Sequence, residues 1–192
     1  MSLLCSEDRR ALLDLARHAV VEAVCHGRVL EFPPPSGALA APGRAFVTLH
    51  RSGRLCGCIG QIVTTESLAE TVARCAVMAA TRDPRFHPVH PEDLGELEIE
   101  ISVLSPLEPI EPEAIEVGRH GLMVAREQQR GVLLPQVAIE HRWTRERFLE
   151  ETCAKAGLEP HAWKDASTKV LAFTAEVFSE AHFRAPQQAQ AS

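Results

Sequence analysis

The sequence has no hydrophobic run that approaches the roughly 18 residues a membrane-spanning helix needs. Glu7 and Asp8 stand near its start, and no apolar segment typical of a signal peptide precedes them. An excess of positive charge is also missing, since the formal net charge is −6. We therefore expect a cytoplasmic protein that contacts neither a membrane nor a nucleic acid.

The six cysteines lack the spacing of a disulfide framework, so we expect free thiols. Cys56 and Cys58 form one close pair, but the chain has no second pair of the kind that structural zinc sites use. Four other side chains offer ligands after folding: His87, His90, His120 and Cys153. The spacing of these residues is weak evidence for a metal site, and we expect no metal and no other cofactor.

What is present is the composition of an ordinary globular protein. Hydrophobic residues make up 45% of the 192 positions and charged residues 24%. A chain of this length forms one domain or two small lobes with a buried core. Only residues 185–192 have the character of a disordered tail.

Apolar residues at helical spacing predict three helices, over residues 6–27, 65–84 and 144–157. Ser6 is the expected cap of the first, which ends at Gly27, and Thr144 is the expected cap of the third. Strict alternation predicts a strand over 95–103 with one apolar face, formed by Leu97, Ile99, Ile101 and Val103. Shorter strands are expected over residues 45–49, 55–60, 115–125, 132–134 and 171–177. Together these elements predict an α+β fold with an antiparallel-rich sheet flanked by helices.

The second strand ends in Leu55-Cys56-Gly57-Cys58-Ile59-Gly60. Because Gly57 and Gly60 have no side chain, a ligand could approach the Cys58 thiol and the nearby N–H groups closely. In a regular strand, Cys56 and Cys58 point to the same face. The sequence therefore makes Cys58 the candidate nucleophile and Gly57 and Gly60 candidate binding positions.

A reactive thiolate needs a nearby positive charge or a base. The helix expected from Thr65 supplies a positive end, and His120, between two glycines, is the candidate base. On this interpretation Cys58 is the fastest thiol, while Cys25 and Cys75, on apolar helix stripes, react slowly. The alternative is that Cys58 packs as a small hydrophobic residue and His120 hydrogen-bonds a backbone carbonyl.

Five short motifs occur in order between about residues 7 and 180: the motif at 55–60, Asp83-Pro84-Arg85-Phe86, Val117-Gly118-Arg119-His120-Gly121, Leu133-Leu134-Pro135-Gln136-Val137-Ala138 and Thr152-Cys153-Ala154-Lys155-Ala156-Gly157-Leu158. In this order they resemble the AMMECR domain family, also called AmmeMemoRadiSam system protein A. The resemblance implies one domain over residues 1–184, made of two unequal lobes with a groove between them. It also implies work alongside a Memo-type protein and a radical S-adenosylmethionine enzyme. The chain lacks the C-x-x-x-C-x-x-C motif of such an enzyme, so it is not itself the radical enzyme.

Three further residues are candidate binding positions, each with a structural alternative: Arg85 and Glu140, which stand in the family motifs, and Glu100, on the polar face of the strand over 95–103. Arg85 either binds an anion or ties down a turn through Asp83. Glu100 either points into the groove or belongs to a solvated strand face. Glu140 either acts in the site or serves the next helix as a cap or an ion pair. Where the family usually has arginine, this chain has Cys56, which removes one expected anion clamp.

Two functions remain open from the sequence. In the first, the chain is a thiol-dependent enzyme or a substrate-modifying subunit that uses Cys58, with the N–H groups of residues 57–60 as anion donors. In the second, it is a non-catalytic module that binds a peptide or a small ligand. An exposed, activated thiol beside an imidazole favours the enzyme, and an open apolar groove favours the binding module.

Overall fold

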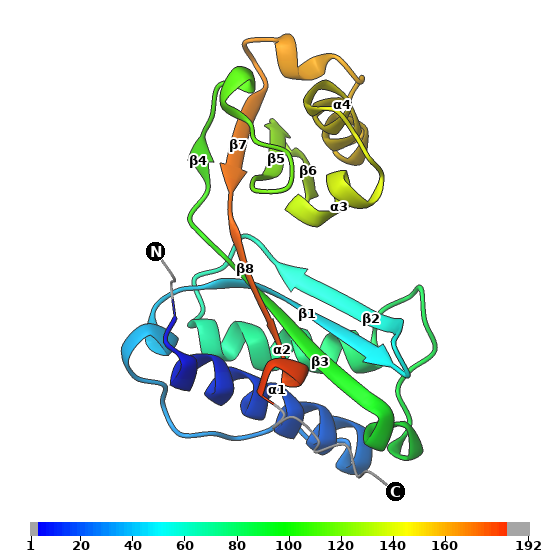
Figure 1. The fold of residues 1–192 in the computed structure, drawn as a ribbon. Coiled ribbons are helices and arrows are strands. Elements are labelled where there is room, and N and C mark those ends of the chain that lie inside the picture. The colour runs from blue at the N-terminus through cyan, green and yellow to red at the C-terminus, as the bar shows by residue number, and fades with distance from the viewer. Residues whose placement is uncertain (1–3, 184–192) are drawn as a thin grey trace, which may run out of the picture. The chain divides into compact units, whose positions relative to one another are not determined.

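The computed structural model describes residues 4–183 (Figure 1). The chain divides into two units, the first formed by Met1–Val103 and Glu176–Ser192 and the second by Leu104–Ala175. Each unit contains one four-stranded antiparallel sheet with its own helices, so the predicted α+β class is confirmed. The predicted tail at residues 185–192 lies outside the described residues. The groove implied by the family resemblance stays a prediction.

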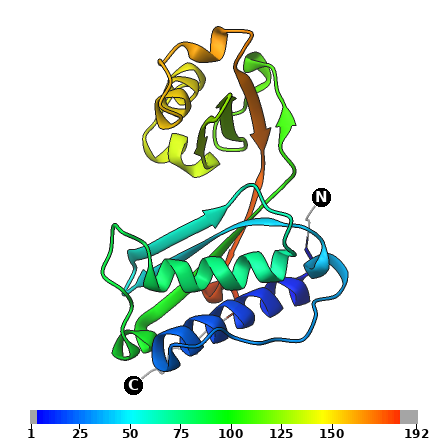
Figure 2. The same cartoon turned by 180° about the vertical axis from the view of Figure 1, so that it is seen from behind.

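In the first unit, the sheet has the order β2-β1-β3-β8. Its elements are α1 (Ser6–His26), β1 (Arg44–Arg51), β2 (Arg54–Gln61), α2 (Leu68–Thr81), β3 (Leu97–Leu104) and β8 (Ala175–Ser179). Both helices cover the same face of this sheet, as the two opposite views show (Figures 1 and 2). Their apolar stripes and the inward side chains of the strands form the core, and the other face of the sheet carries no helix of this unit.

The helix ends of the first unit differ in detail from the prediction. Cys5, not Ser6, caps α1, because its sulfur accepts a hydrogen bond from the Asp8 N–H and the Asp8 carboxylate accepts one from the Cys5 N–H. Gly27 ends this helix with a φ of 64°, as expected of a glycine C-cap. Ser67 and Glu70 form a capping box that starts α2 three residues after Thr65.

The strand β3 confirms the predicted buried face. Its apolar side chains are all buried in the core of the first unit: Leu97, Ile99, Ile101 and Val103. The strand begins at Leu97 because residues 91–96 form a 3-10 helix. The opposite face is less exposed to solvent than predicted, since Glu98 and Glu100 are half-buried and Ser102 is buried.

We expect Ile101→Ala to lower the free energy of unfolding by about 2 to 5 kcal/mol, because it leaves a cavity in the core. Ile101 is fully buried, at 0% exposure, whereas Glu98 on the same strand is half-buried on the opposite face. Glu98→Ala should therefore cost far less. Urea denaturation of both variants measures the difference, and equal losses would contradict the assignment of the buried face.

In the second unit, the sheet has the order β4-β7-β5-β6. Its elements are β4 (Glu108–Pro109), β5 (Gly121–Arg126), β6 (Gln129–Leu133), α3 (Pro135–Glu140), α4 (Arg145–Lys155) and β7 (Lys169–Phe173). The core of this unit joins α3 and α4 to β5 and β7, mainly through Leu122, Ala138, Phe148, Leu149 and Ala172.

Two predicted strands of the C-terminal half are corrected. Residues 117–119 form a turn, and the strand starts only at Gly121, because the N–H groups of Arg119 and His120 donate to the Glu116 carbonyl instead of to a neighbouring strand. The strand predicted over residues 171–177 is two strands, β7 and β8, which belong to different sheets. Alternation continues across Thr174 in the sequence, so the break could not be seen there.

Candidate functional site

Cys58 lies on β2, an edge strand of the first sheet, opposite Thr48 of β1. The Thr48 hydroxyl donates a hydrogen bond to the Cys58 sulfur at 3.4 Å. Val47 and Leu49, the neighbours of Thr48 on β1, point into the core. Cys58 therefore lies on the sheet face that no helix of this unit covers, and it is half-buried there.

Cys56 does not share this face, contrary to the expectation for a regular strand. The register passes from Leu49 opposite Gly57 to His50 opposite Leu55, so Cys56 is the extra residue of a β-bulge. Its thiol donates to the Leu49 carbonyl at 3.4 Å, and its side chain packs against the core. Burial raises the pKa of this thiol. The two cysteines therefore do not act as a pair.

The Asp83-Pro84-Arg85-Phe86 motif completes the sheet edge at Cys58. The Cys58 N–H donates to Asp83 Oδ2 at 2.8 Å, and Arg85 Nη2 donates to the Cys58 carbonyl at 2.8 Å. Arg85 also binds Asp83 through its Nε at 2.9 Å, its Nη2 at 2.7 Å and its backbone N–H at 3.1 Å. Two side chains thus bind both backbone groups that an edge strand exposes at this residue.

Asp83 is the buried centre of this arrangement, with a side chain only 1% exposed. Its hydrogen bonds from the Arg85 side chain lower its pKa to about 2, and the bond from the Cys58 N–H acts in the same direction. The geometry supports the structural alternative for Arg85, in which it holds a turn through Asp83. The Arg85 guanidinium still keeps an exposed edge, since its side chain is 56% exposed.

The glycines beside Cys58 have a packing role. A Cβ on Gly57 would lie 2.2 Å from the Ala79 carbonyl oxygen of α2, and a Cβ on Gly60 would lie 2.2 Å from the Phe46 ring. At both glycines, the space that a side chain would take is already filled, so a ligand cannot enter it. This corrects the expectation of open space on that side of each residue. Backbone of α2 and an aromatic ring fill that space instead.

His120, the candidate base, belongs to the second unit, whereas Cys58 belongs to the first. Its Nδ1 accepts a hydrogen bond from the Glu116 N–H at 3.0 Å, rather than donating to a carbonyl as the alternative expected. Because a backbone N–H only donates, the neutral imidazole carries its proton on Nε2. In this tautomer Nδ1 uses its lone pair to accept the Glu116 N–H, and Nε2 carries the proton. His120 therefore has no free lone pair with which to act as a general base. Its pairing with Cys58 stays a prediction.

The two glutamates lie apart in the fold. Glu100 is half-buried on the same sheet face as Cys58, since the alternate residues of β3 enter the core. Glu140 is exposed at the end of α3 in the second unit. Thr144, not Glu140, caps α4 by accepting the Arg147 N–H at 3.2 Å. The roles of both carboxylates in a site stay predictions.

The thiols differ most through burial. Cys75 is 2% exposed, and burial raises its pKa to about 11. Burial also raises the pKa of Cys153. Cys25 is exposed on the last turn of α1, so the burial on which its expected slow reaction rested is absent.

We expect iodoacetamide at pH 7.5 to label Cys58 at least about tenfold faster than Cys75, because thiolate fraction and access both decrease with burial. Peptide mass spectrometry after limited labelling ranks the sites, with exposed Cys25 as the internal reference. Equal rates for Cys58 and Cys75 would contradict the exposure assigned to β2. A rate for Cys58 well above that of Cys25 would indicate an activated thiol.

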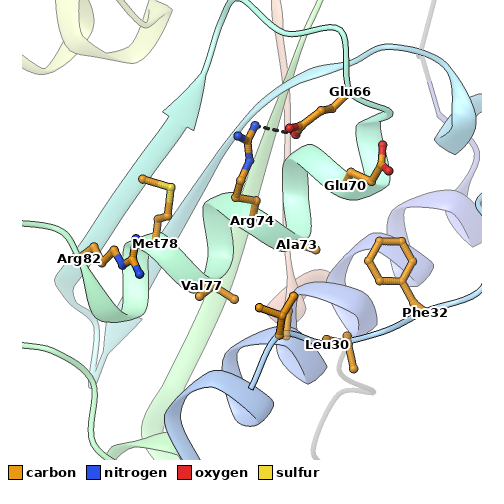
Figure 3. A pocket seen from close by; sticks show the side chains of 11 residues that line it. Leu30, Phe32, Glu66, Glu70, Ala73, Arg74, Val77, Met78 and Arg82 are labelled. Atoms are coloured by element: carbon orange, nitrogen blue, oxygen red, sulfur yellow. Dashed lines mark ion pairs between the residues drawn. The ribbon is translucent and has the colours of Figure 1, made fainter. Parts of the chain in front are cut away.

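A pocket beside α2, here called the α2 pocket, was not expected from the sequence (Figure 3). It has a volume of about 470 Å³ and lies between α2, Ala19 of α1 and residues 29–32. The α2 side chains in its wall recur at helical spacing: Glu70, Ala73, Arg74, Val77, Met78 and Arg82. Ala73, Val77 and Met78, apolar residues of α2 beside its core stripe, were the signal for this pocket in the sequence.

Within residues 4–183, no three histidine, cysteine or acidic side chains are placed to hold a metal ion. In the same residues, no helix is long and apolar enough to cross a membrane.

Comparison with known proteins identifies the family. The AMMECR1 family model matches residues 13–178. A protein of Thermococcus gammatolerans is 47% identical over 189 residues, which cover 91% of each chain, and protein TK0174 of Thermococcus kodakarensis is 46% identical over 188 residues with the same coverage. The crystal structure of the uncharacterized protein PH0010 from Pyrococcus horikoshii matches with a TM-score of 0.84 at 41% identity, covering 93% of this chain and 94% of that one. The chain therefore belongs to the AMMECR1 family.

Proposed function

We propose that this chain is a non-catalytic binding module, and that its α2 pocket holds a small ligand with an apolar body and one anionic group. The α2 pocket carries the proposal. Its volume of about 470 Å³ falls in the range of about 300 to 1,000 Å³ typical of small-molecule sites. Leu30, Phe32, Ala73 and Val77 offer an apolar wall to the ligand body (Figure 3).

The charged side chains of the α2 pocket indicate the sign of the charge on the ligand. Arg74 pairs with Glu66 at 2.6 Å and also bonds Gln61. Glu70 accepts hydrogen bonds from the N–H and the hydroxyl of Ser67 at its Oε2 atom. Among residues 4–183, the Arg82 side chain has neither an ion pair nor a hydrogen bond, and it stands beyond Met78 at the C-terminal end of α2 (Figure 3). The free N–H donors of this guanidinium favour an anionic group on the part of the ligand that lies near Arg82, at the opposite end of α2 from the Glu70 carboxylate (Figure 3).

A thiol-dependent enzyme is the second candidate, because the Cys58 thiol is only half-buried on an edge strand and the Thr48 hydroxyl donates a hydrogen bond to its sulfur. Two observations speak for the binding module instead. The Cys58 N–H, an expected anion donor, already donates to the Asp83 carboxylate. The expected base, His120, uses its Nδ1 to accept the Glu116 N–H.

The family resemblance alone suggests partners, a Memo-type protein and a radical S-adenosylmethionine enzyme. We propose that the binding module presents its ligand to one of them. Size-exclusion chromatography of the purified chain with each candidate tests this, with the shift of the elution peak as the readout. Separate elution of all three proteins, with and without ligand, would contradict it.

A tryptophan at position 73 should block the α2 pocket, since Ala73 lies in its wall. The probe is 1-anilinonaphthalene-8-sulfonate, which joins an apolar body to one sulfonate. We expect saturable fluorescence enhancement with the unaltered chain and at least about tenfold weaker binding to Ala73→Trp. Ala11→Trp, on the exposed side of α1, is the control that should bind normally. Equal binding to both variants would contradict the proposal.

Arg82→Gln tests the anionic group separately, because Arg82 is exposed and its replacement leaves the core unchanged. This variant should bind 1-anilinonaphthalene-8-sulfonate several-fold more weakly. It should bind the uncharged analogue N-phenyl-1-naphthylamine as well as the unaltered chain does. Equal affinity of both proteins for the sulfonate would show that the α2 pocket does not select anions.

A further inference from the structure

The second unit contains a pocket that the proposed function does not use. It has a volume of about 390 Å³ and lies between β4, the end of β7 and the turn that carries Arg119 and His120. Ile110 and Phe173 contribute apolar walls, and Arg119, His120 and Glu108 contribute the charged or titratable side chains. Two residues of the Val117-Gly118-Arg119-His120-Gly121 motif thus line one cavity.

The turn that carries these residues is closed by several hydrogen bonds around Glu116. The Glu116 carbonyl accepts the N–H of Arg119 at 3.2 Å and that of His120 at 3.0 Å. In return, the Glu116 N–H donates to His120 Nδ1 at 3.0 Å. The backbone and the ring of His120 are therefore both held by the same residue.

The two glycines of the motif permit this turn. Gly118 has a φ of +89°, which a residue with a side chain rarely adopts. A Cβ on Gly121 would lie 2.3 Å from the Phe173 ring, which also lines the pocket. The glycines of this motif therefore place Arg119 and His120 at the pocket wall.

The bond to Glu116 decides what His120 offers to a ligand. With Nδ1 accepting, the proton of the neutral ring is on Nε2, and this N–H is a donor. The Arg119 Nη1 binds Glu116 Oε1 at 2.8 Å, while its side chain remains 63% exposed and its guanidinium has further N–H donors. Ser105 is not available, since its hydroxyl accepts the Thr174 N–H at 3.0 Å and donates to the Pro106 carbonyl at 3.2 Å.

We propose that this pocket is a second ligand site, in which Arg119 and the Nε2–H of His120 bind the carboxylate of a small molecule whose apolar part contacts Ile110 and Phe173. A guanidinium binds a carboxylate through charge-assisted hydrogen bonds, and a neutral N–H donor in the same pocket can add a further bond. Glu108 lines the same pocket, so the ligand carboxylate must lie on the Arg119 side. The site is independent of the α2 pocket, because all its residues belong to the second unit.

The first test is the tautomer of His120, observed in long-range ¹H–¹⁵N spectra of protein labelled at histidine and assigned with a His120→Gln variant. We expect the Nε2–H form at pH 7.5. The Nδ1–H form would overturn the proposal, because His120 would then accept at Nε2 and repel a carboxylate.

The second test follows the His120 resonances during titration with 4-methylpentanoate and with its neutral amide, 4-methylpentanamide. The carboxylate should shift the Nε2 signal saturably, and the amide should bind at least about tenfold more weakly. Arg119→Gln should weaken carboxylate binding at least about fivefold, whereas Arg130→Gln, on an exposed position of β6, should not. Equal shifts with both probes, or unchanged affinity in Arg119→Gln, would overturn the site. Because the readout is the ring of His120, binding in the α2 pocket does not affect the result.

Discussion

Asp83→Ala should lower the free energy of unfolding by about 3 to 4 kcal/mol, the cost of breaking a buried charge-paired network. The change removes the acceptor of the Cys58 N–H and leaves the Arg85 guanidinium without its carboxylate. Asp83→Asn keeps one acceptor oxygen, so it should cost less, about 2 kcal/mol. Asp165→Asn is the matched control, because Asp165 also pairs with an arginine but its side chain is 54% exposed. Its effect should be much smaller, and urea denaturation at pH 7 measures all three.

The contribution of Asp83 should depend on pH in one direction. Its pKa is about 2 in the folded chain, below the value of about 3.9 expected in the unfolded chain. A carboxylate with a lowered pKa stabilises the fold above the unfolded pKa and loses this contribution as the pH falls from about 4 towards 2. The stability difference between the unaltered chain and Asp83→Asn should therefore be largest at neutral pH and smaller at pH 3. A difference that stays constant from pH 7 to pH 3 would contradict the bonds assigned to Asp83.

Gly57→Ala should cost about 3 kcal/mol, because the added methyl group has no space. It would lie 2.2 Å from the Ala79 carbonyl oxygen and 3.0 Å from the carbonyl carbon, and both are helix backbone that cannot turn aside. α2 would have to move away from the sheet. Gly95→Ala is the control, since nothing lies within 4 Å of its added Cβ. Calorimetric melting that shows equal stability of the two variants would contradict the close approach of β2 and α2.

The second unit repeats this contact between a strand and a helix. A Cβ on Gly131 of β6 would lie 2.3 Å from the Ala156 nitrogen and 2.4 Å from the Thr152 carbonyl oxygen, at the end of α4. Gly57 lies in a segment that carries the family resemblance, and Gly131 stands two residues before another. Close packing of helix backbone on a strand is thus one physical reason for glycine in these segments.

Local patterns in the sequence were enough to predict much of the fold. The buried face of β3, the glycine at the end of α1 and the Thr144 cap of α4 each depend on a few neighbouring residues, and the structure has them. The same holds for the turn in which Arg85 binds Asp83, which the sequence offered as one of two interpretations. The family motifs predicted the family, and the comparisons agree.

The candidate site depended on contacts that no local pattern contains. Asp83 is 25 positions from Cys58 in the chain, and it can bind the Cys58 N–H only because β2 is an edge strand. The bulge that turns Cys56 away depends on the register of β1 against β2. Strand order and register arise from the packing of the whole sheet, so period-two alternation alone predicted the wrong direction for Cys56.

By itself, the sequence determined the family, the α+β class, most helices and the buried face of β3, because each follows from short-range spacing of side chains. Only the tertiary structure decided that the strands form two sheets, that Gly57 touches α2, and that apolar residues beside the core stripe of α2 line a pocket with residues 29–32. These features join segments that are distant in the chain. Such contacts depend on how the surfaces of whole elements pack together. The spacing of residues within one segment does not show which other segment it will contact.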